Sequence, residues 1–593
     1  MKKTLIALFL ILFSIGAFAQ DRFMHNVNPV REDGLNVIER FIRSVSPPVL
    51  YSPMAYPGEI PGTSNFWDYQ TNGSSLNSIM VFGDTILFCF PAVDSTDPTG
   101  TSTRVAKLVI TTNGGVNWDA PLPLSTLPNR SGYPELRKVY LTGNVTSVLL
   151  SGRKYNGSSS RGGAWVDAFF GLGSFTSANV PEAGRDYFGD LISGGMFGGV
   201  FSAQITTSAD SLYYCKYNYN TNTMSGRTVL AVSPTNISGN VRYRLASDGG
   251  NNLFVMWYDN TTAAYAMRYA TSTNAGTSFS SVGSLQTAFG VGGVVNGDTC
   301  SPWFGMDATY KPNTTQWHAV WSTLYPTSTG QSSGSNQGCK ILFATPTING
   351  GLPVEVAGKI NMTIISNTTL FNNRQSLQVG VTPVSHPTIA FSSNGSRIVV
   401  AFSAFQPGDS LDSFTYNDIY MTYSDNGGAN WITPKNITTT QTWDELYPIL
   451  SETGNTPTQF TIKYQVTKGP GSQSFTDNAP TYRVYHVMKK FNPLTVGISE
   501  IGGNTPSNYS LSQNYPNPFN PTTTIRFAIP KSGFVTLKVY DITGKVIETL
   551  VSQQLKAGTK EVIFDASNLP SGVYFYSLVT DGYKETKKMM LIK

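Results

Sequence analysis

The sequence is poor in charge, cysteine and histidine, and each shortage narrows the kinds of protein it can be. Only 13% of its 593 residues are charged, and ten basic against six acidic residues from position 511 onward leave a nearly neutral body. A neutral body binds nucleic acid poorly, because that binding depends on neutralising phosphates. The four cysteines form no C-x-x-C pair, and the four histidines form no H-E-x-x-H motif. No nucleic-acid partner, metal or other cofactor is therefore predicted.

Long hydrophobic runs are missing too, except at the start of the chain. Lys2 and Lys3 precede an apolar run from Leu5 to Ile15, and Ala-Phe-Ala then fits a small-x-small cleavage site. Residues 1–19 are predicted to be a secretory signal peptide, since the run is short for a membrane span, which is the alternative. No later run is long enough to cross a bilayer, so no transmembrane segment is predicted after signal removal.

The four cysteines stand far apart in the sequence. Export would permit disulfides, and Cys300 and Cys339 are the closest pair and therefore the expected bridge. Cys89 and Cys215 lie in strand-like runs, ILFCF and LYYCKY, where buried thiols are expected.

Turn-forming and aromatic residues are plentiful where charge is scarce. The chain has 56 Gly, 34 Pro and 12% aromatic residues, and its 40% hydrophobic content is enough for a core. Few segments carry Ala, Leu, Glu and Lys at helical spacing. This mixture favours many short strands joined by turns, so the predicted fold class is all-β.

One turn pattern occurs three times, each time after a strand-like run. It reads Ser or Thr, any residue, Asn, any residue, Gly, two residues, then Trp or Phe. The Asn side chain can accept backbone N–H groups within the turn, and Gly permits a positive φ. The aromatic side chain is then expected to fold back into a neighbouring apolar layer. The residues are Asn113, Gly115 and Trp118; Asn274, Gly276 and Phe279; and Asn426, Gly428 and Trp431.

A second recurring element is a strand that opens with proline, a position at which no ladder hydrogen bond is lost. These prolines are Pro134, Pro302, Pro387 and Pro448. The repeated unit reads strand, turn, strand, longer loop, strand, turn and strand. Four antiparallel strands repeated in this way are typical of β-propeller blades. Seven blades are predicted over residues 51–497, preceded by an N-terminal segment at 20–50, with six blades as the alternative.

The three turns resemble the Asp-box, the bacterial neuraminidase repeat of sialidase-like propellers, with Asn where that family more often has Asp. The resemblance implies a sialidase-like propeller in which these turns are structural and lie away from the active site. Sialidases also use an arginine triad for the substrate carboxylate, a Tyr/Glu nucleophile pair, an Asp acid/base and an Arg-Ile-Pro signature. That signature is missing here, and no spacing singles out three arginines among Arg137, Arg153, Arg185, Arg242 and Arg244.

Polar and aromatic residues near the starts of the blade-opening strands are the candidate ligand site, because these strands line the central channel of a propeller. An acid pair beside aromatic rings would suit sugar binding or glycoside hydrolysis. The alternative is that they form hydrogen bonds between neighbouring blades. The candidates are Glu135, Trp303, His386, Asp444, Glu445 and Tyr447.

From residue 511 the chain changes to period-2 strands, which predict a small Ig-like antiparallel sandwich over 511–593 behind a linker at 498–510. This segment closely resembles the type A sorting domain of the type IX secretion system, through YPNPFNP, VYDITGK, LPSGVY and KKMMLIK. The residues carried over as the sorting signal are Tyr515, Pro516, Asn517, Pro518, Gly544, Gly572, Lys587 and Lys588.

The resemblance implies two partners for the C-terminal domain: the type IX translocon and a sortase-like peptidase that removes it. The protein is then expected, by way of the periplasm, in the medium or on the outer cell surface. The predicted function is binding of an extracellular glycan or protein by the propeller, and the alternative is a sialidase-like glycoside hydrolase with an atypical site. Two carboxylates and three arginines converging at the channel mouth would favour the enzyme.

Overall fold

The computed structural model describes residues 56–593 with gaps. The gaps are residues 57, 67–76, 95–96, 98–101, 157–158, 182–185, 207–208, 233–242, 260–264, 289, 328–329, 333–337, 359–361, 363–381, 412–413, 439, 441–442, 470–482, 494–497, 502–505, 521, 556, 567–568 and 593. The predicted signal peptide and the N-terminal segment at 20–50 lie outside the described residues.

Seven antiparallel sheets follow one another along the described part of the propeller. The first is β1 (Ile79–Phe82), β2 (Thr85–Ala92), β3 (Val105–Thr111) and β4 (Leu122–Pro123). The second is β5 (Ser131–Leu141), β6 (Val145–Asn156), β7 (Ser159–Asp167) and β8 (Phe175–Asn179). The third is β9 (Phe188–Ile192), β10 (Met196–Thr206) and β11 (Ala209–Asn218), with β12 (Thr223–Met224) and β13 (Thr228–Val232) both on β11. The fourth is β14 (Tyr243–Ser247), β15 (Leu253–Asp259), β16 (Ala266–Ser272) and β17 (Gly283–Thr287).

The last three sheets vary this plan slightly. The fifth is β20 (Ser301–Tyr310), β21 (Trp317–Thr327), β23 (Ile341–Ala344) and β24 (Val354–Ala357), with β22 (Gly330–Ser332) paired to β21. A small hairpin of β18 (Val294–Val295) and β19 (Asp298–Thr299) precedes it, and one 3-10 turn, η2 (Asn349–Gly351), lies within it. The sixth is β25 (Val384–Phe391), β26 (Ile398–Leu411), β27 (Phe414–Ser424) and β28 (Lys435–Asn436). The seventh is β29 (Asp444–Leu450), β30 (Phe460–Thr467) and β31 (Val484–Phe491).

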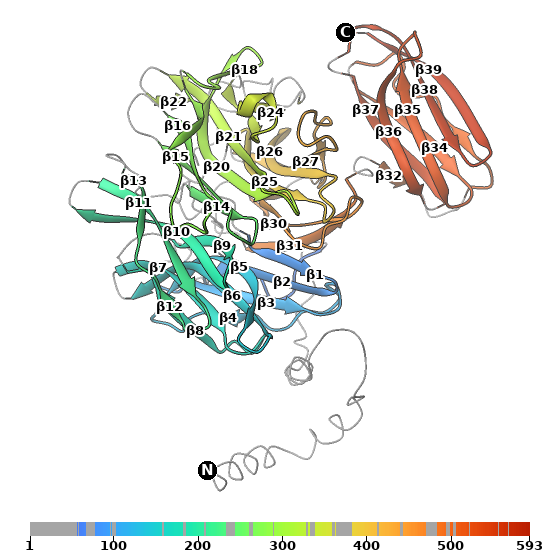
Figure 1. Cartoon of the computed structure of the whole chain (residues 1–593). Coiled ribbons are helices and arrows are strands. Elements are labelled where there is room, and N and C mark those ends of the chain that lie inside the picture. The colour runs from blue at the N-terminus through green and yellow to red at the C-terminus, as the bar shows by residue number, and fades with distance from the viewer. Residues whose placement is uncertain are drawn as a thin grey trace, which may run out of the picture. The chain divides into compact units, whose positions relative to one another are not determined.

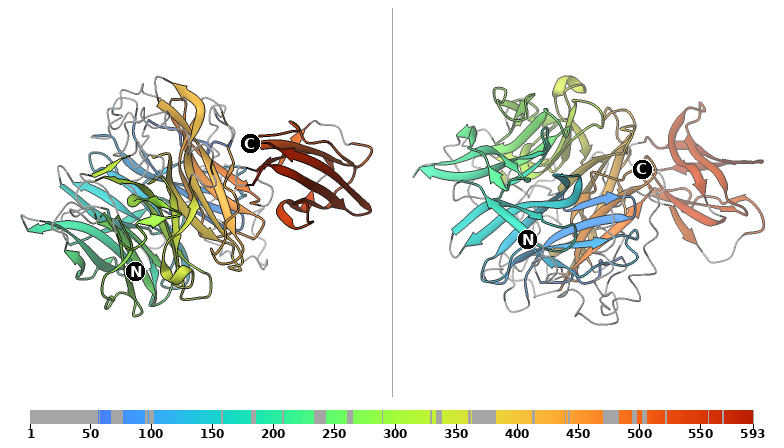
Figure 2. Two further views of the ribbon diagram at one scale, coloured as in Figure 1. Left: turned by 90° about the horizontal axis from the view of Figure 1, so that it is seen from above. Right: turned by 60° about the horizontal axis from the view of Figure 1, so that its bottom comes forward.

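The first strands of successive sheets contact one another, so the sheets stand as blades around a common centre (Figures 1 and 2). The last sheet is completed from the N-terminal side. Glu59 bridges to Val487 and Asn65 to Val484, both antiparallel, beside the outer strand β31. This closes the ring between the first and last blades, and the prediction of a seven-bladed propeller is confirmed over the described residues.

Burial explains why the propeller strands read as apolar runs. Every residue of β25, β29 and β30 is buried, because each blade packs against a neighbour on both faces. The strands of the C-terminal domain alternate instead, as in β35 (Gly533–Tyr540), because only one face of each sheet meets the core.

The three repeated turns share one hydrogen-bonding scheme. In the last of them, Ser424 Oγ accepts the N–H of Gly428 at 2.9 Å, and Asn426 Oδ1 accepts the N–H of Asn430 at 3.0 Å. Equivalent bonds form around Asn113 and around Asn274. The hydroxyl and amide side chains thus satisfy backbone donors that a tight turn would otherwise leave open.

The aromatic residue of each turn reaches its own apolar partner. Trp118 is 7% exposed and lies in the core between the last and first blades. Phe279 meets Tyr214 edge to face at 5.2 Å, and Trp431 meets Phe343 in the same way at 5.2 Å. Each turn therefore clasps the preceding blade.

The C-terminal domain consists of two four-stranded sheets around a separate core. One is β32 (Ile498–Ile501), β37 (Gly558–Asp565), β34 (Thr522–Ile529) and β33 (Ser510–Leu511). The other is β36 (Val546–Leu555), β35, β38 (Gly572–Thr580) and β39 (Tyr583–Leu591). Residues 498–501 were predicted as linker, but they pair with β37 and so belong to this domain's sheet.

The cysteines depart from one expectation. Cys89, Cys215 and Cys300 are buried free thiols, so the predicted bridge from Cys300 to Cys339 is absent from the structure. Burial raises the pKa of the Cys215 thiol to about 12 and that of Cys300 to about 11. Thiols held in this way are poor nucleophiles.

Candidate functional site

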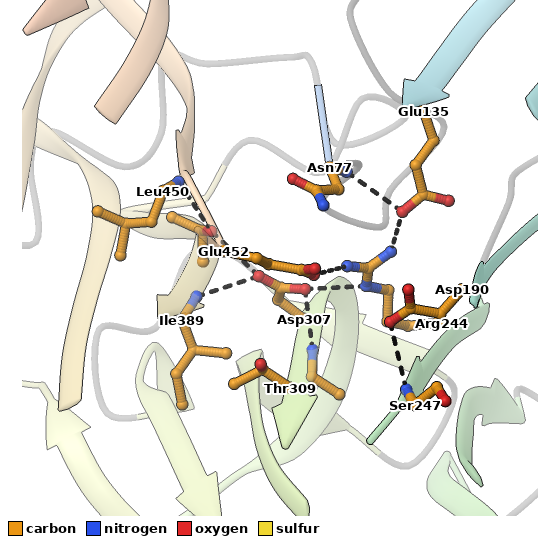
Figure 3. A network of polar contacts seen from close by, with 12 residues as sticks. Asn77, Glu135, Asp190, Arg244, Ser247, Asp307, Thr309, Ile389, Leu450 and Glu452 are labelled. Atoms are coloured by element: carbon orange, nitrogen blue, oxygen red, sulfur yellow. Dashed lines mark hydrogen bonds and ion pairs between the residues drawn. The ribbon is translucent and has the colours of Figure 1, made fainter. Parts of the chain in front are cut away.

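The first strands of the blades bring charged side chains together at the centre of the ring. Arg244, at the start of β14, donates to Glu135 of the second blade, to Asp307 of the fifth at 2.9 Å and to Glu452 of the seventh at 3.0 Å. Figure 3 shows its guanidinium group between these carboxylates. Arg244 is 2% exposed and Glu135 1%. A single buried cation thus links carboxylates from three other blades.

A second arginine, Arg137, extends these contacts. We call the whole set the axial network; it consists of Glu135, Arg137, Asp190, Arg244, Asp307 and Glu452. Arg137 Nε donates to Asp190 of the third blade at 2.6 Å, and its Nη2 lies 3.7 Å from Glu452. Asp307 also accepts the Thr388 hydroxyl and the Ile389 N–H, each at 3.0 Å. These contacts satisfy most of the hydrogen-bonding capacity of the charged groups, so the network fits a structural role at the ring centre.

Glu452 should make the stability of the propeller depend measurably on pH. Burial first, then the nearby Asp190 and Asp307, raise the pKa of this carboxyl from 4.5 to about 7, against the opposing effect of Arg137 and Arg244. A raised pKa means that the folded state keeps a proton that the unfolded state has released, so this group's contribution to stability falls as pH rises from about 4.5 to 7. Chemical unfolding at pH 5 and pH 7.5 should show this fall in the wild type and a smaller one in Glu452→Gln. If the wild type and Glu452→Gln lost the same free energy of unfolding between the two pH values, Glu452 would not be the group responsible.

A second cluster gathers three arginines around two tyrosines at one end of the second blade. We call it the tyrosine–arginine cluster; it consists of Arg104, Arg130, Tyr133, Arg153 and Tyr155. Arg104 Nη1 donates to the Tyr133 hydroxyl at 3.2 Å, and Arg104 Nη2 donates to the Tyr155 hydroxyl. The guanidinium carbons of Arg104 and Arg130 lie 4.9 and 4.4 Å from the Tyr155 ring centre, within cation–π range.

Asp186 anchors this cluster from the third blade. Arg153 donates to both of its carboxylate oxygens, at 2.7 and 2.5 Å. Asp186 is fully buried, whereas Arg130 and Tyr155 are half-buried. Gly132 leaves room for Arg104, since a Cβ there would lie 2.9 Å from Arg104 Nε. Most of the cluster is therefore buried, and Arg130 and Tyr155 form its more exposed side.

Strand direction places the cluster away from the repeated turns. Arg104 directly precedes β3, and the first repeated turn begins where β3 ends, at Thr111. Arg130 directly precedes β5, and Tyr155 lies near the end of its antiparallel partner β6. The cluster and the structural turns thus lie at opposite ends of the sheets.

Three inner strands each have one non-glycine residue with a positive φ near the same end. Tyr133, His386 and Tyr447 each precede a proline and have φ of 51°, 51° and 55°. The strand register shifts at each of these positions. Non-glycine residues at positive φ are uncommon, and such strain gathers at functional sites. At these register shifts, Tyr133 lies in the tyrosine–arginine cluster, and the His386 ring lies against that of Tyr447, with ring centres 4.5 Å apart.

The other predicted site residues are distributed along the inner strands. Asp444 is fully buried and accepts the backbone and side-chain N–H groups of Asn417. Glu445 is also fully buried, accepts the Tyr56 hydroxyl at 2.9 Å, and has its pKa raised to about 10, first by burial and then by Asp418. Trp303 is half-buried and meets Tyr258 at 6.1 Å. Of the six candidates, His386 and Tyr447 thus lie together, whereas Glu135 pairs with Arg244.

The tyrosine–arginine cluster was only partly foreseen. Arg153 was one of the five arginines named from the sequence, while Arg137 and Arg244 lie in the axial network. Arg185 and Arg242 fall outside the described residues. Arg104, Arg130 and Tyr155 were missed, although the spacing of Arg153 and Tyr155 places both on one face of β6.

The C-terminal domain matches a known family. Residues 513–593 match the model of the secretion system C-terminal sorting domain. The protein is thus a substrate of type IX secretion, exported to the cell surface or the extracellular space. The sorting domain implies an interaction with the type IX secretion machinery. No curated protein matches the chain.

Solved structures are similar to the chain only at a distance. An ulvan lyase covers 72% of this chain and 95% of its own, at 8% identity and a TM-score of 0.45. The NanB sialidase of Streptococcus pneumoniae covers 74% and 71%, at 9% identity and a TM-score of 0.34. The Penicillium chrysogenum α-L-arabinanase covers 63% and 95%, at 13% identity and a TM-score of 0.35. Similarities this distant say nothing about activity or substrate. Among the described residues, no helix has the length and apolar character needed to span a bilayer.

Proposed function

We propose that this exported propeller binds an extracellular glycan that carries carboxylate groups, and that it does so at the tyrosine–arginine cluster. The observation that supports this proposal is the convergence of three guanidinium groups on two tyrosine rings. Guanidinium groups pair with carboxylates through two parallel hydrogen bonds. The tyrosines add apolar ring faces next to polar groups, a combination suited to a sugar acid.

Within the cluster, Arg130 and Tyr155 are the expected contacts with the ligand. The reason is exposure, since Arg104, Tyr133 and Arg153 are buried. Arg130 and Tyr155 are half-buried and are the more exposed members. The buried residues position these two, and the half-buried pair receives the ligand.

Binding is favoured here over hydrolysis. Glycoside hydrolases of the common type need two carboxyl groups, one to donate a proton and one to act as base or nucleophile. Asp186 is buried and occupied by Arg153, and Glu135 is tied to Arg244 in the axial network. These two carboxylates therefore serve as ion-pair partners, which suits a binding module.

A glycan array with the purified full chain tests this proposal. Glycans bearing uronic or sialic acids should be retained and their neutral counterparts should not. Arg130→Ala should weaken binding by about tenfold to hundredfold, the range expected for losing hydrogen bonds to a charged group. The matched control is Arg268→Ala, which removes a half-buried arginine paired with Asp259 in the fourth blade. Retention of neutral sugars alone, or equal effects of the two substitutions, would refute the proposal, and turnover of a retained glycan would favour the hydrolase.

Three finer assignments belong to the same proposal. Residues 1–19 are proposed to be a signal peptide that delivers the chain to the periplasm. The three clasping turns are proposed to be Asp-box repeats, supported by their shared hydroxyl and asparagine hydrogen bonds. A sortase-like peptidase is proposed to remove the C-terminal domain after export. Mass spectrometry of the secreted protein would establish both ends of the mature chain.

A further inference from the structure

The second blade carries further basic side chains beside the tyrosine–arginine cluster. Its strands β5, β6 and β7 are neighbours in one sheet (Figure 1). The Tyr155 N–H of β6 donates to the carbonyl of Arg130, just before β5, at 2.9 Å. Lys154 of β6 stands directly opposite Arg161 of β7. Because neighbouring strands lie about 4.8 Å apart, Arg130, Lys154 and Arg161 follow one another across the blade near one level. We call these three residues the basic row.

The two outer members of the basic row have no acidic partner among the residues that the structure describes. Arg161 is exposed and donates to the carbonyl of Pro181 at 3.0 Å. Lys154 is half-buried, donates to Ser177 Oγ at 2.7 Å, and has its ammonium nitrogen 5.5 Å from the centre of the Trp165 ring. Burial lowers the pKa of this ammonium group. Two like charges thus stand side by side, and no described carboxylate neutralises them.

This pair of cations is unfavourable for the empty fold. Like charges directly opposite each other on neighbouring strands destabilise a sheet. In the fourth blade, by contrast, Arg268 lies 3.4 Å from the carboxylate of Asp259. The second blade nevertheless makes room for its lysine, since a Cβ at Gly163 would lie 2.6 Å from Lys154 Cδ. A bound anion would offset the repulsion between the two side chains.

We propose that the basic row is a second subsite, which receives a carboxylate from a neighbouring sugar of the same glycan. This inference rests on the proposed function, because Arg130 belongs to both the row and the tyrosine–arginine cluster. It narrows the ligand to a linear glycan that carries acidic groups on successive sugars and runs outward across the second blade. A nucleic acid is the less favoured polyanion, because the propeller as a whole is nearly neutral.

The test is calorimetric titration of the purified full chain with two probes. One is a tetramer of galacturonic acid, which has a carboxylate on every sugar, and the other is a neutral tetrasaccharide with one terminal glucuronic acid. The double variant Lys154→Gln/Arg161→Gln should bind the tetramer about fivefold to thirtyfold more weakly than the wild type, the range for losing two partly exposed charge pairs. Its affinity for the singly charged probe should stay within about twofold of wild type.

Lys138→Gln is the matched control for this experiment. Lys138 is also half-buried, with its ammonium nitrogen 4.9 Å from the centre of the Phe82 ring, but it lies toward the opposite end of β5 and β6. This variant should bind both probes as the wild type does. The double variant should unfold at or above the wild-type temperature, because two like charges have been removed. A lower unfolding temperature would contradict the repulsion inferred for the basic row.

The outcomes separate this inference from the proposed function. Wild-type affinity of the double variant for the tetramer would overturn the second subsite while leaving the tyrosine–arginine cluster as a binding site. Failure of the wild type to bind either probe would overturn the proposed function itself. Equally tight binding of a single-stranded oligodeoxynucleotide with the same number of charges would show that the row responds to charge alone, and would overturn its assignment to a glycan.

Discussion

Replacing Arg244 with methionine is expected to reduce the free energy of unfolding of the propeller by about 3–5 kcal/mol, the range found when one partner of a buried ion pair is removed. Arg244 donates to carboxylates from three other blades and is 2% exposed. Methionine keeps much of the length of the side chain but leaves Glu135 and Asp307 without this cation. Both are buried, so neither can turn to solvent instead.

Tryptophan fluorescence during guanidinium unfolding measures this loss in the right domain, because all nine tryptophans lie between positions 67 and 443. The matched control is Arg268→Met, since Arg268 is 28% exposed and meets Asp259 at 3.4 Å. Exposed pairs contribute about 0–1 kcal/mol. If both variants unfold at the same denaturant concentration, the axial network does not hold the blades together.

Gly428→Ala is expected to destabilise the propeller by about 2–5 kcal/mol, adding an overpacked contact to backbone strain. Gly428 has φ of +99°, and a Cβ at this position would lie 2.2 Å from Cε1 of Phe343 in the preceding blade. The turn would have to lift away, and Trp431 would lose its edge-to-face contact with the same ring.

The neighbouring residue provides the control within the same turn. Gly427 has φ of +75°, but a Cβ there would meet nothing within 4 Å. Gly427→Ala should therefore cost only the strain of a left-handed alanine, about 1–2 kcal/mol. The same fluorescence measurement should separate the two variants by about 1–3 kcal/mol. Equal losses would mean that the turn does not clasp the preceding blade.

The blade pattern could be predicted because it rests on local chemistry. A Ser or Thr, an Asn and a Gly at fixed spacing make one turn within eight residues. The first two side chains make its hydrogen bonds, and the Gly adopts its positive φ. Proline at the start of an inner strand is also a local signal. Pro134, Pro387 and Pro448 all lie in inner strands, directly after the three residues at positive φ.

The site could not be predicted in the same way, because its members come from separate elements. Arg104 precedes β3, Arg130 precedes β5, and Asp186 lies before β9 in the next blade. Their meeting depends on how neighbouring blades pack, which no local pattern contains. The acid pair Asp444 and Glu445 looked like ligand chemistry in the sequence. Both side chains are fully buried, with Asn417, Tyr56 and Thr440 as hydrogen-bond partners.

Calorimetric titration with one acidic glycan and its methyl ester tests the proposed recognition most directly. The two ligands share every sugar ring and differ only at the carboxyl groups, where the ester has an added methyl group and no charge. The tyrosine–arginine cluster predicts that the wild type binds the acid at least about tenfold more tightly than the ester, since charge-assisted hydrogen bonds contribute about 1.5–3 kcal/mol. Arg130→Ala should largely remove this preference. Equal affinity of the wild type for acid and ester would contradict carboxylate recognition by this propeller.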